Sequence, residues 1–568
     1  MSSPTGDDGR RDIRRDRLPH DGFLHALEHD VEAELELAGD GPDGRPDPRP
    51  VDEWLDPDAQ RYEIGLQNLL GAVESAEDSV HEAMPGAGHA SRPTTSTADT
   101  LGPGQPMAAM PHRHGSRVPA RDHCLSLVRA VDRPTAAARY GRMFPQLEPL
   151  AGDPKSLLRA GDPGGVCDAG AALDRLTGTA GDDATEAAGW PFFGQLIAHD
   201  ITADRSPVGG ATGPDHLRNA RGPKLDLELL YADGPIGSPF LFDLEDPAKF
   251  LLGPGGHDVP RNQQGVALIG DPRNDVHLFS LSLHVALLRA HNRIVDRLRT
   301  AGVAEADLVD AARVTLTWHH QWIVVHDFLP RLVGADLVEQ VLAEGGRWFA
   351  PEPGHGYIPL EFADAAYRYG HGQIRHSYRL VAGGPAVPLF PDLTGFGPLP
   401  AERRLDLAQI FDLPGRPPAQ RAKRLDGRLA TSLIGLPRQV TGEVETDDYR
   451  SLAVRDLIRG ETTGLPSGEA VARLLGAAPL TADELGQDWP HGTPLWYYVL
   501  KEAQHRGDGD RLGPVGGRIV TEVLIGLLRA DPASYLSLEP DWRPHLPAAG
   551  ATYALTDLLT LGDDREES

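Results

Sequence analysis

Apolar residues recur at helical spacing along most of the chain after residue 122. The spacing predicts helices over residues 190–202, 311–332, 361–374, 451–460, 464–471, 494–500 and 516–528, and a long helix that follows Asn274 or Asp275 and runs to residue 295. Alternation of polar and apolar residues, the pattern of a half-buried strand, is found over 224–231. We therefore expect a mainly α protein, built as a single large helical domain with little β structure.

Composition divides the chain into three regions. Residues 1–117 are rich in Pro, Gly, Asp and His, which predicts a largely disordered acidic N-terminal extension. Residues 118–547 carry the helical periodicity and form the predicted domain, which is long enough to bury a cofactor. Residues 548–568 end in charged residues and are predicted to form an acidic C-terminal tail.

The charge of the chain disfavours several classes of partner. Its 55 Lys and Arg against 83 Asp and Glu give a net charge of −28, which repels nucleic acids and anionic membrane surfaces. Cys124 and Cys167 can form at most one disulfide and lack metal-site spacing. The first residues are charged and lead into no apolar segment, and no later run is long enough to span a bilayer. We expect a cytoplasmic protein, with non-classical export as the alternative.

The first candidate site lies in the predicted helix 190–202. Gln195 and His199 are four residues apart and share one face of this helix, beside its apolar stripe. Asp200 points about 100° away from His199 and must serve another partner. A core histidine satisfied by a neighbouring carbonyl is the alternative interpretation of His199.

Arg273 marks a second candidate site at the start of the predicted helix that runs to residue 295, which Asn274 or Asp275 can cap. The helix dipole disfavours a cation at this end unless an anion or a carboxylate lies nearby. Arg273 is therefore either a residue of a binding site or a surface arginine paired with an acid.

A third candidate site lies in the predicted helix 361–374, where Arg368 and His371 share a face and Gly370 and Gly372 flank the histidine. Each glycine costs about 1 kcal/mol in a helix relative to alanine. Two of them beside one histidine indicate that a bulky group passes close to the backbone, as a flat cofactor would.

Two carboxylates alternate with leucines in the segment 224–231. If this segment is an extended loop, Asp226 and Glu228 project to one side, and carbonyl oxygens lie between them. Oxygen ligands in this pattern suit calcium, and Asp200 would add a further carboxylate. A strand with one solvated face explains the same residues equally well.

Taken together, two helical histidines far apart in the sequence and an arginine at a helix start match the needs of haem peroxide chemistry. One neutral imidazole would hold the iron. The second would move a proton from one peroxide oxygen to the other, and the arginine would stabilise negative charge on the departing oxygen.

The sequence resembles the animal-type haem peroxidase superfamily, the peroxidase and cyclooxygenase group, in its bacterial branch. The motifs that carry the resemblance are residues 193–202 (FGQLIAHDIT), 270–273 (GDPR), 291–293 (HNR), 366–371 (AYRYGH), 465–468 (LPSG) and 513–518 (GPVGGR). They follow the family order and span about 122–536. The resemblance implies a single helical haem-peroxidase domain.

The resemblance also implies roles for individual residues. His199 matches the distal histidine, Gln195 its partner, and Arg273 the distal arginine. His371 matches the proximal ligand of the haem iron, and Arg368 matches the residue that pairs with a haem propionate.

A calcium site is implied by the same resemblance. Asp200 and Asp226 match side-chain ligands, and Lys224 matches a carbonyl ligand. The chain departs from the family pattern at Gly222, where threonine is usual, and at Glu228, where serine or aspartate is usual.

Three further departures from the family change the expected cofactor chemistry. Ala198 and Val276 stand where the mammalian enzymes have ester-forming carboxylates, so we expect noncovalent haem b. Asp456 is the nearest match to the asparagine that usually accepts the second N–H of the proximal histidine. A carboxylate there would raise the basicity of His371 and lower the iron potential. His277 replaces a methionine of one subgroup, and the sequence assigns it no contact.

We therefore expect a peroxidase that reduces hydrogen peroxide and oxidises a small organic donor or a halide. The cyclooxygenase branch forms its radical on a tyrosine three residues before the proximal histidine, and here that position is Arg368, with Tyr367 and Tyr369 as unassigned alternatives. A haem-dependent fatty-acid dioxygenase and a catalytically silent helical binding protein are the competing hypotheses. The donor and the oligomeric state are not specified by the sequence.

Overall fold

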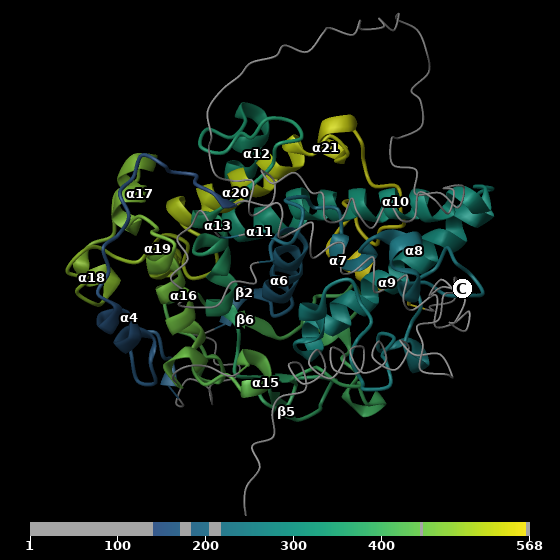
Figure 1. Cartoon of the computed structure of the whole chain (residues 1–568), viewed down its shortest axis with the longest axis horizontal. Helices are drawn as coiled ribbons and strands as arrows, with labels where there is room; N and C mark the ends of the chain where they lie inside the picture. Colours follow the sequence, from purple (N-terminus) through teal and green to yellow (C-terminus); the bar gives the residue numbers. More distant parts are fainter. Residues whose placement is uncertain (1–139, 171–182, 204–216, 218, 443–446, 564–568) are drawn as a thin grey trace, which may run out of the picture. The chain divides into compact units, whose positions relative to one another are not determined.

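The computed structural model describes residues 140–170, 183–203, 217, 219–442 and 447–563 (Figure 1). The predicted extension 1–117 lies outside these residues, and so does Cys124. The division of the chain into three regions therefore stays a prediction.

Helices dominate the described part of the chain. The α-helices are α4 (Pro154–Gly161), α6 (Trp190–Ile201), α7 (Glu228–Tyr231), α8 (Gly234–Gly237), α9 (Leu278–Thr300), α10 (Leu308–Ile323), α11 (Leu329–Val333), α12 (Ala335–Glu344), α13 (Leu360–Ala363), α14 (Thr431–Ile434), α15 (Arg438–Thr441), α16 (Leu452–Thr462), α17 (Gly468–Leu475), α18 (Ala482–Leu485), α19 (Leu495–Arg506), α20 (Pro514–Ala530), α21 (Tyr535–Leu538) and α22 (Leu555–Thr560). The prediction of a mainly α fold is confirmed.

The strands of the described part are short and pair two by two. β1 (Tyr140–Gly141) runs parallel to β3 (Ile358–Pro359), whereas β2 (Asp183–Ala187) and β6 (Arg421–Lys423), and likewise β4 (Ser377–Arg379) and β5 (Ala386–Pro388), are antiparallel. Pairs of this size cannot stabilise a fold alone, so the helices provide the core.

Helix α6 is buried on almost every side and packs against α9 and against the 3₁₀ helix η8 (Ala366–Gln373). Phe192 stacks on Phe279 of α9 with ring centroids 4.4 Å apart, and Phe193 meets Phe328 edge to face at 5.6 Å. Each phenylalanine of this kind contributes about 1.5–3 kcal/mol by leaving water. The packing of α6 therefore fixes the positions of Gln195 and His199 relative to α9 and η8.

Two predicted helices differ from those observed. The predicted helix 311–332 is a continuous run in which α10 passes through one π-helical turn, η7 (Val324–Phe328), into α11. The predicted helix 361–374 is broken after α13 and resumes as η8. Glycines at 370 and 372 lower helix propensity, which accounts for the short 3₁₀ turn in place of an α-helix.

The start of α9 is capped by a residue that the sequence analysis did not select. His277 is the N-cap, and its Nδ1 accepts the N–H of Ser280 at 3.2 Å. Asp271 caps the preceding 3₁₀ turn η5 (Pro272–Asp275) by accepting the N–H of Arg273. The expected caps, Asn274 and Asp275, instead make side-chain contacts within the structure.

Helix α22 lies within the segment predicted to be an acidic tail. Leu555, Leu558 and Leu559 are buried, the helix packs against α9, and Arg289 of α9 pairs with Asp563. The three leucines have helical spacing, but the acidic residues that follow them led to the prediction of a tail.

Segment 224–231 is neither a strand nor a fully extended loop. Leu227 has φ 57°, and the chain then turns into α7. The Oδ2 atom of Asp200 accepts the N–H of Leu227 at 3.0 Å, and its Oδ1 accepts the N–H of Leu229 at 3.4 Å. Asp200 thus faces a partner other than the one His199 faces, as its position on α6 predicts.

Replacing Asp200 with alanine should lower the free energy of unfolding by about 2–4 kcal/mol, because two buried amide N–H groups lose their acceptor. Urea denaturation would measure this loss. Asp200→Asn keeps one carbonyl acceptor and should lose clearly less than the alanine variant. Equal stability of wild type and Asp200→Ala would refute this role.

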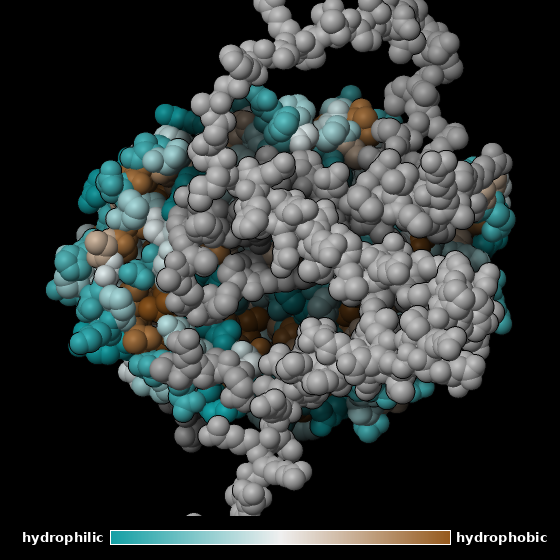
Figure 2. All heavy atoms as spheres, in the orientation of Figure 1, coloured by the Kyte–Doolittle hydropathy of each residue, from teal (hydrophilic) through white to brown (hydrophobic). Residues whose placement is uncertain are grey.

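The described surface on the face shown in Figure 2 is largely hydrophilic, with hydrophobic residues in scattered patches. No helix of the described part of the chain is long and apolar enough to cross a membrane.

Candidate functional site

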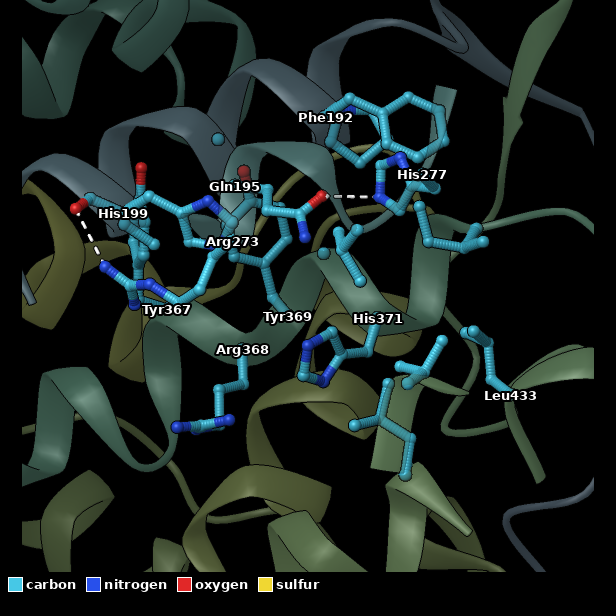
Figure 3. A pocket seen from close by; sticks show the side chains of 18 of the residues that line it. Phe192, Gln195, His199, Arg273, His277, Tyr367, Arg368, Tyr369, His371 and Leu433 are labelled. Atoms are coloured by element: carbon cyan, nitrogen blue, oxygen red, sulfur yellow. Dashed lines mark hydrogen bonds between the residues drawn. The ribbon is translucent and has the colours of Figure 1, made fainter. Parts of the chain in front are cut away.

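A cavity of about 290 Å³ lies between α6, the start of α9 and η8. Its lining includes five of the six residues predicted for catalysis or cofactor binding, namely Gln195, His199, Arg273, Arg368 and His371, but not the sixth, Asp456. Figure 3 shows Gln195, His199 and Arg273 on one side of this pocket, with Arg368 and His371 on the other. Residues up to 176 positions apart in the chain, such as Gln195 and His371, are therefore brought to one place.

His371 is held by a buried carboxylate. Its Nδ1 lies 2.6 Å from Oδ2 of Asp456, which is fully buried on α16. Because Nδ1–H donates to this carboxylate, Nε2 is the ring nitrogen left to bind a metal. The contact predicted between His371 and Asp456 is present in the structure.

Arg368 neutralises the same carboxylate. Its Nη1 lies 3.3 Å from Oδ1 of Asp456, and its Nη2 lies 3.6 Å from Asp364. Residues three apart eclipse in a 3₁₀ helix, so η8 places Arg368 and His371 on one side, where both reach Asp456. The guanidinium is therefore committed to two carboxylates in this structure, whereas the resemblance implies a propionate partner.

His199 is fixed by a residue that the sequence analysis considered only as a helix cap. Its Nδ1 lies 2.7 Å from Oδ1 of Asn274, whose Nδ2 in turn lies 3.0 Å from Nδ1 of His284. An amide oxygen only accepts, so Nδ1 of His199 carries the proton and Nε2 is an unprotonated base. Burial and the nearby charge of Arg273 lower the pKa of His199 to about 4.

Arg273 has the carboxylate partner that its place beside a helix start requires. Nε and Nη2 donate to the two oxygens of Asp271 at 3.0 and 2.7 Å, and Nη2 also donates to the carbonyl oxygen of His199 at 2.9 Å. Both interpretations of Arg273 thus hold, because the residue is paired with an acid and also lines the cavity.

Asp271 also binds a second arginine, Arg221, which the sequence analysis missed. Nη2 of Arg221 lies 2.6 Å from Oδ2 of Asp271, and its Nη1 lies 3.3 Å from Oε1 of Glu228. The two guanidinium groups hold the pKa of Asp271 below its usual range, against the opposing effect of burial. No sequence signal identifies Arg221, because its partners are 7 and 50 residues away.

The carboxylates of the predicted calcium ligands are engaged by other groups of the chain. Glu228 is engaged by Arg221 and by the N–H of Gly222, and the carboxylate of Asp200 accepts two backbone amides. The Oδ1 atom of Asp226 accepts the N–H of Glu228. In the described ranges, no group of three or more His, Cys, Asp and Glu side chains is arranged to hold a metal ion.

The predicted calcium site, including the Lys224 carbonyl, stays a prediction. Arg221 supplies positive charge beside these carboxylates, and Lys224 directs its Nζ to Asp531 at 3.1 Å. Burial raises the pKa values of Asp200 and Asp226, and repulsion adds to it, from Asp226 for Asp200 and from Glu228 for Asp226.

Gln195 has a different partner from the one expected. Its Oε1 lies 3.0 Å from Nε2 of His277 (Figure 3). His199 is bound to Asn274 instead. The two residues of α6 share a face, as predicted, but each is held by a separate residue near the start of α9. Spacing within one helix cannot reveal a partner on another helix.

The two glycines beside His371, Gly370 and Gly372, lie in different surroundings. A Cβ atom at Gly372 would lie 3.0 Å from Leu425 and 3.2 Å from Leu500, so core packing explains this glycine and the expected cofactor does not. Gly370 lines the cavity, and a Cβ there would lie 3.8 Å from the nearest atom, on Pro191.

Ala198 and Val276, at the two positions where the mammalian enzymes carry ester-forming carboxylates, also line the cavity, as do Tyr367 and Tyr369. The cavity wall therefore offers no carboxylate at 198 or 276 for an ester bond.

Burial raises the pKa values of both tyrosines, so their hydroxyl groups keep their protons at neutral pH.

Comparison with known proteins gives a match over part of the chain. The profile of the family described as animal haem peroxidase matches residues 214–390, which contain Arg273, Arg368 and His371. Human thyroid peroxidase is 29% identical over 159 residues, which are 26% of this chain and 16% of that protein. Dual oxidase of Drosophila melanogaster is 32% identical over 109 residues, 19% of this chain and 7% of that protein. The aligned segments thus span less than a fifth of these relatives.

Among solved structures, peroxidase A from Dictyostelium discoideum has a TM-score of 0.48 at 15% identity, over 71% of this chain and 89% of that one. Fatty acid alpha-dioxygenase of Oryza sativa has a TM-score of 0.48 at 14% identity, over 73% of this chain and 78% of that one. Because both TM-scores lie below 0.5, these likenesses carry no information about activity.

Proposed function

We propose that the protein is a haem-dependent peroxidase of the bacterial branch of the animal haem peroxidase family, whose profile matches residues 214–390. It would reduce hydrogen peroxide and oxidise a small organic donor or a halide. One observation carries the proposal: two histidines lie on opposite sides of one cavity. His371 is bound to a carboxylate, and His199 is neutral.

The residues present fit a haem. The carboxylate of Asp456 leaves Nε2 of His371 free as an iron ligand, and apolar and aromatic side chains form most of the cavity wall. We propose noncovalent haem b, because Ala198 and Val276 cannot form ester bonds. When bound, haem supplies the electrons that break the O–O bond of peroxide.

The chain's own residues would handle the protons of the reaction. Nε2 of His199 takes the proton from one peroxide oxygen and returns it to the other, so that the departing oxygen leaves as water. Asn274 holds His199 in the required tautomer, and His284 in turn holds Asn274. Arg273 adds positive charge beside this base, on the same side of the cavity.

The reaction with peroxide should be almost independent of pH from 7 down to about 5. The pKa of His199 is lowered to about 4, so the base loses its free Nε2 only when the pH falls through about 4. Stopped-flow measurement of the rate constant for peroxide would test this, with circular dichroism to confirm folding at each pH. An inflection near 6.5 would indicate a solvated histidine and contradict the buried site.

The fatty-acid dioxygenase alternative has no observation of its own. The position three residues before His371 is Arg368, which binds Asp456 and cannot form a tyrosyl radical. Oxygen consumption with a polyunsaturated fatty acid, without peroxide-dependent oxidation, would reverse the choice. A silent binding protein would show neither reaction.

The first experiment is the absorption spectrum of the protein purified with haem supplied, before and after one equivalent of hydrogen peroxide. A ferric Soret band of a histidine-ligated haem that shifts on peroxide is the expected result. A folded protein that retains no haem would refute the proposed function.

A further inference from the structure

We propose that His277 is a positioning residue that fixes the orientation of Gln195, so that the amide N–H groups of Gln195, and not its carbonyl oxygen, face the cavity. The proposal deepens the proposed function, because the ligand that the amide would meet is the one bound beside haem. It assigns a role to a histidine that lines the cavity and that proton transfer by His199 does not use.

The contacts of His277 determine its tautomer. Nδ1 lies 3.2 Å from the backbone nitrogen of Ser280, which has a hydrogen to donate, so Nδ1 must be an acceptor. In a neutral imidazole the proton is then on Nε2, and Nε2–H donates to Gln195 at 3.0 Å. The Gln195 atom that receives this bond can only be the carbonyl oxygen, because the amide nitrogen has no acceptor capacity.

The ring of His277 has little freedom to turn. It lies edge to face with Phe192 at 5.2 Å and with Phe390 at 6.2 Å between ring centroids. Its backbone forms a bridge with Thr394, and the residue is 4% exposed. Burial lowers the pKa of His277 to about 3, so the ring stays neutral over the working range of an enzyme.

The orientation of Gln195 follows from this fixed donor. With Oε1 bound to His277, the amide nitrogen is turned to the other side of the group, away from the histidine (Figure 3). A ligand atom beside Gln195 in the cavity then meets a hydrogen-bond donor and must itself be an acceptor, as a peroxide oxygen or a small anion is. Without His277 the amide could rotate by 180° and present its carbonyl oxygen, which repels a small anion.

The test is a double-mutant cycle on the ferric haem protein, with fluoride as the probe and the Soret band as the readout. Gln195→Leu removes the donor and should weaken fluoride binding by about tenfold or more, since a hydrogen bond to a charged group is lost. His277→Leu leaves Gln195 in place but unfixed and should weaken binding about threefold to tenfold. The double variant should bind no more weakly than Gln195→Leu, because His277 acts only through Gln195.

Additive losses in the double variant, or fluoride affinity unchanged in His277→Leu, would overturn the proposal. His277→Gln is the conservative control, because its amide can donate to Gln195 and accept from Ser280, and it should recover most of the affinity. The unfolding temperature of each variant, measured alongside, identifies any variant that has lost its fold.

A second readout does not require haem. In NMR spectra of the protein labelled with ¹⁵N-histidine, the signal of His277 is identified by its absence from the spectrum of His277→Leu. In the wild type this signal should be that of a neutral ring protonated at Nε2, from pH 7 to pH 5. A ring protonated at Nδ1, or a charged ring, would overturn the proposal even if no haem binds. A protein that binds no haem but shows this tautomer would refute only the proposed peroxidase function.

Discussion

Replacing His199 with alanine is expected to slow the reaction with peroxide by about 10²–10⁴-fold while haem remains bound. The variant loses the unprotonated Nε2 that accepts the peroxide proton, but it keeps His371 and Asp456 on the other side of the cavity. Stopped-flow mixing of the ferric protein with peroxide would measure the rate, and the absorption spectrum would report haem binding.

His355→Ala is the matched control, because this histidine is exposed and does not line the cavity. It should react with peroxide at the wild-type rate. If His199→Ala binds haem and also reacts at that rate, another group is the base and the assignment of the distal side is wrong.

Replacing Asp456 with asparagine should raise the Fe(III)/Fe(II) potential of the haem protein by about 60–120 mV. The carboxylate gives His371 partial imidazolate character and so favours Fe(III), whereas an amide oxygen is a weaker acceptor. A tenfold to hundredfold change in the relative stability of the two oxidation states corresponds to that range, because 59 mV is tenfold for one electron. Spectroelectrochemical titration would measure the shift.

Asp364→Asn is the control for this experiment. Asp364 also lies beside Arg368, at 3.6 Å, and the hydrogen bond to Nδ1 of His371 comes from Asp456. The control should leave the potential close to that of the wild type. An unchanged potential in Asp456→Asn, or equal shifts in the two variants, would show that Asp456 does not act through His371.

The residues of the cavity were predictable because each combines an unusual residue type with a definite helical position. His199 and Gln195 lie on one face of an apolar helix, and Arg273 lies where the helix dipole requires a carboxylate. The order of the motifs then brought His371 and Asp456 into the same prediction. Local spacing predicted the helical positions of these side chains, whereas the pairing of His371 with Asp456 was implied by the resemblance of the motifs to a known family.

The partners within the cavity were not predictable for the same reason. Asn274 binds His199, 75 residues away, and His277 binds Gln195, 82 residues away, so no local pattern marks either contact. The ion pairs of Arg221 with Glu228 and Asp271 were likewise not predictable. Both cases depend on which side chain tertiary packing brings near, and helical periodicity does not contain that information.

Helix α22 gives the molecule a vulnerable point for proteolysis. It is joined to the rest of the chain by residues 547–552, which are all exposed, and it packs on α9, whose first turn begins at the cap residue His277. A helix of six residues is not stable alone, so a cut in this linker would release α22. The side of α9 that the leucines of α22 cover would then be exposed. A protease that removes only the last few per cent of the chain would thereby loosen the helix that positions the cavity.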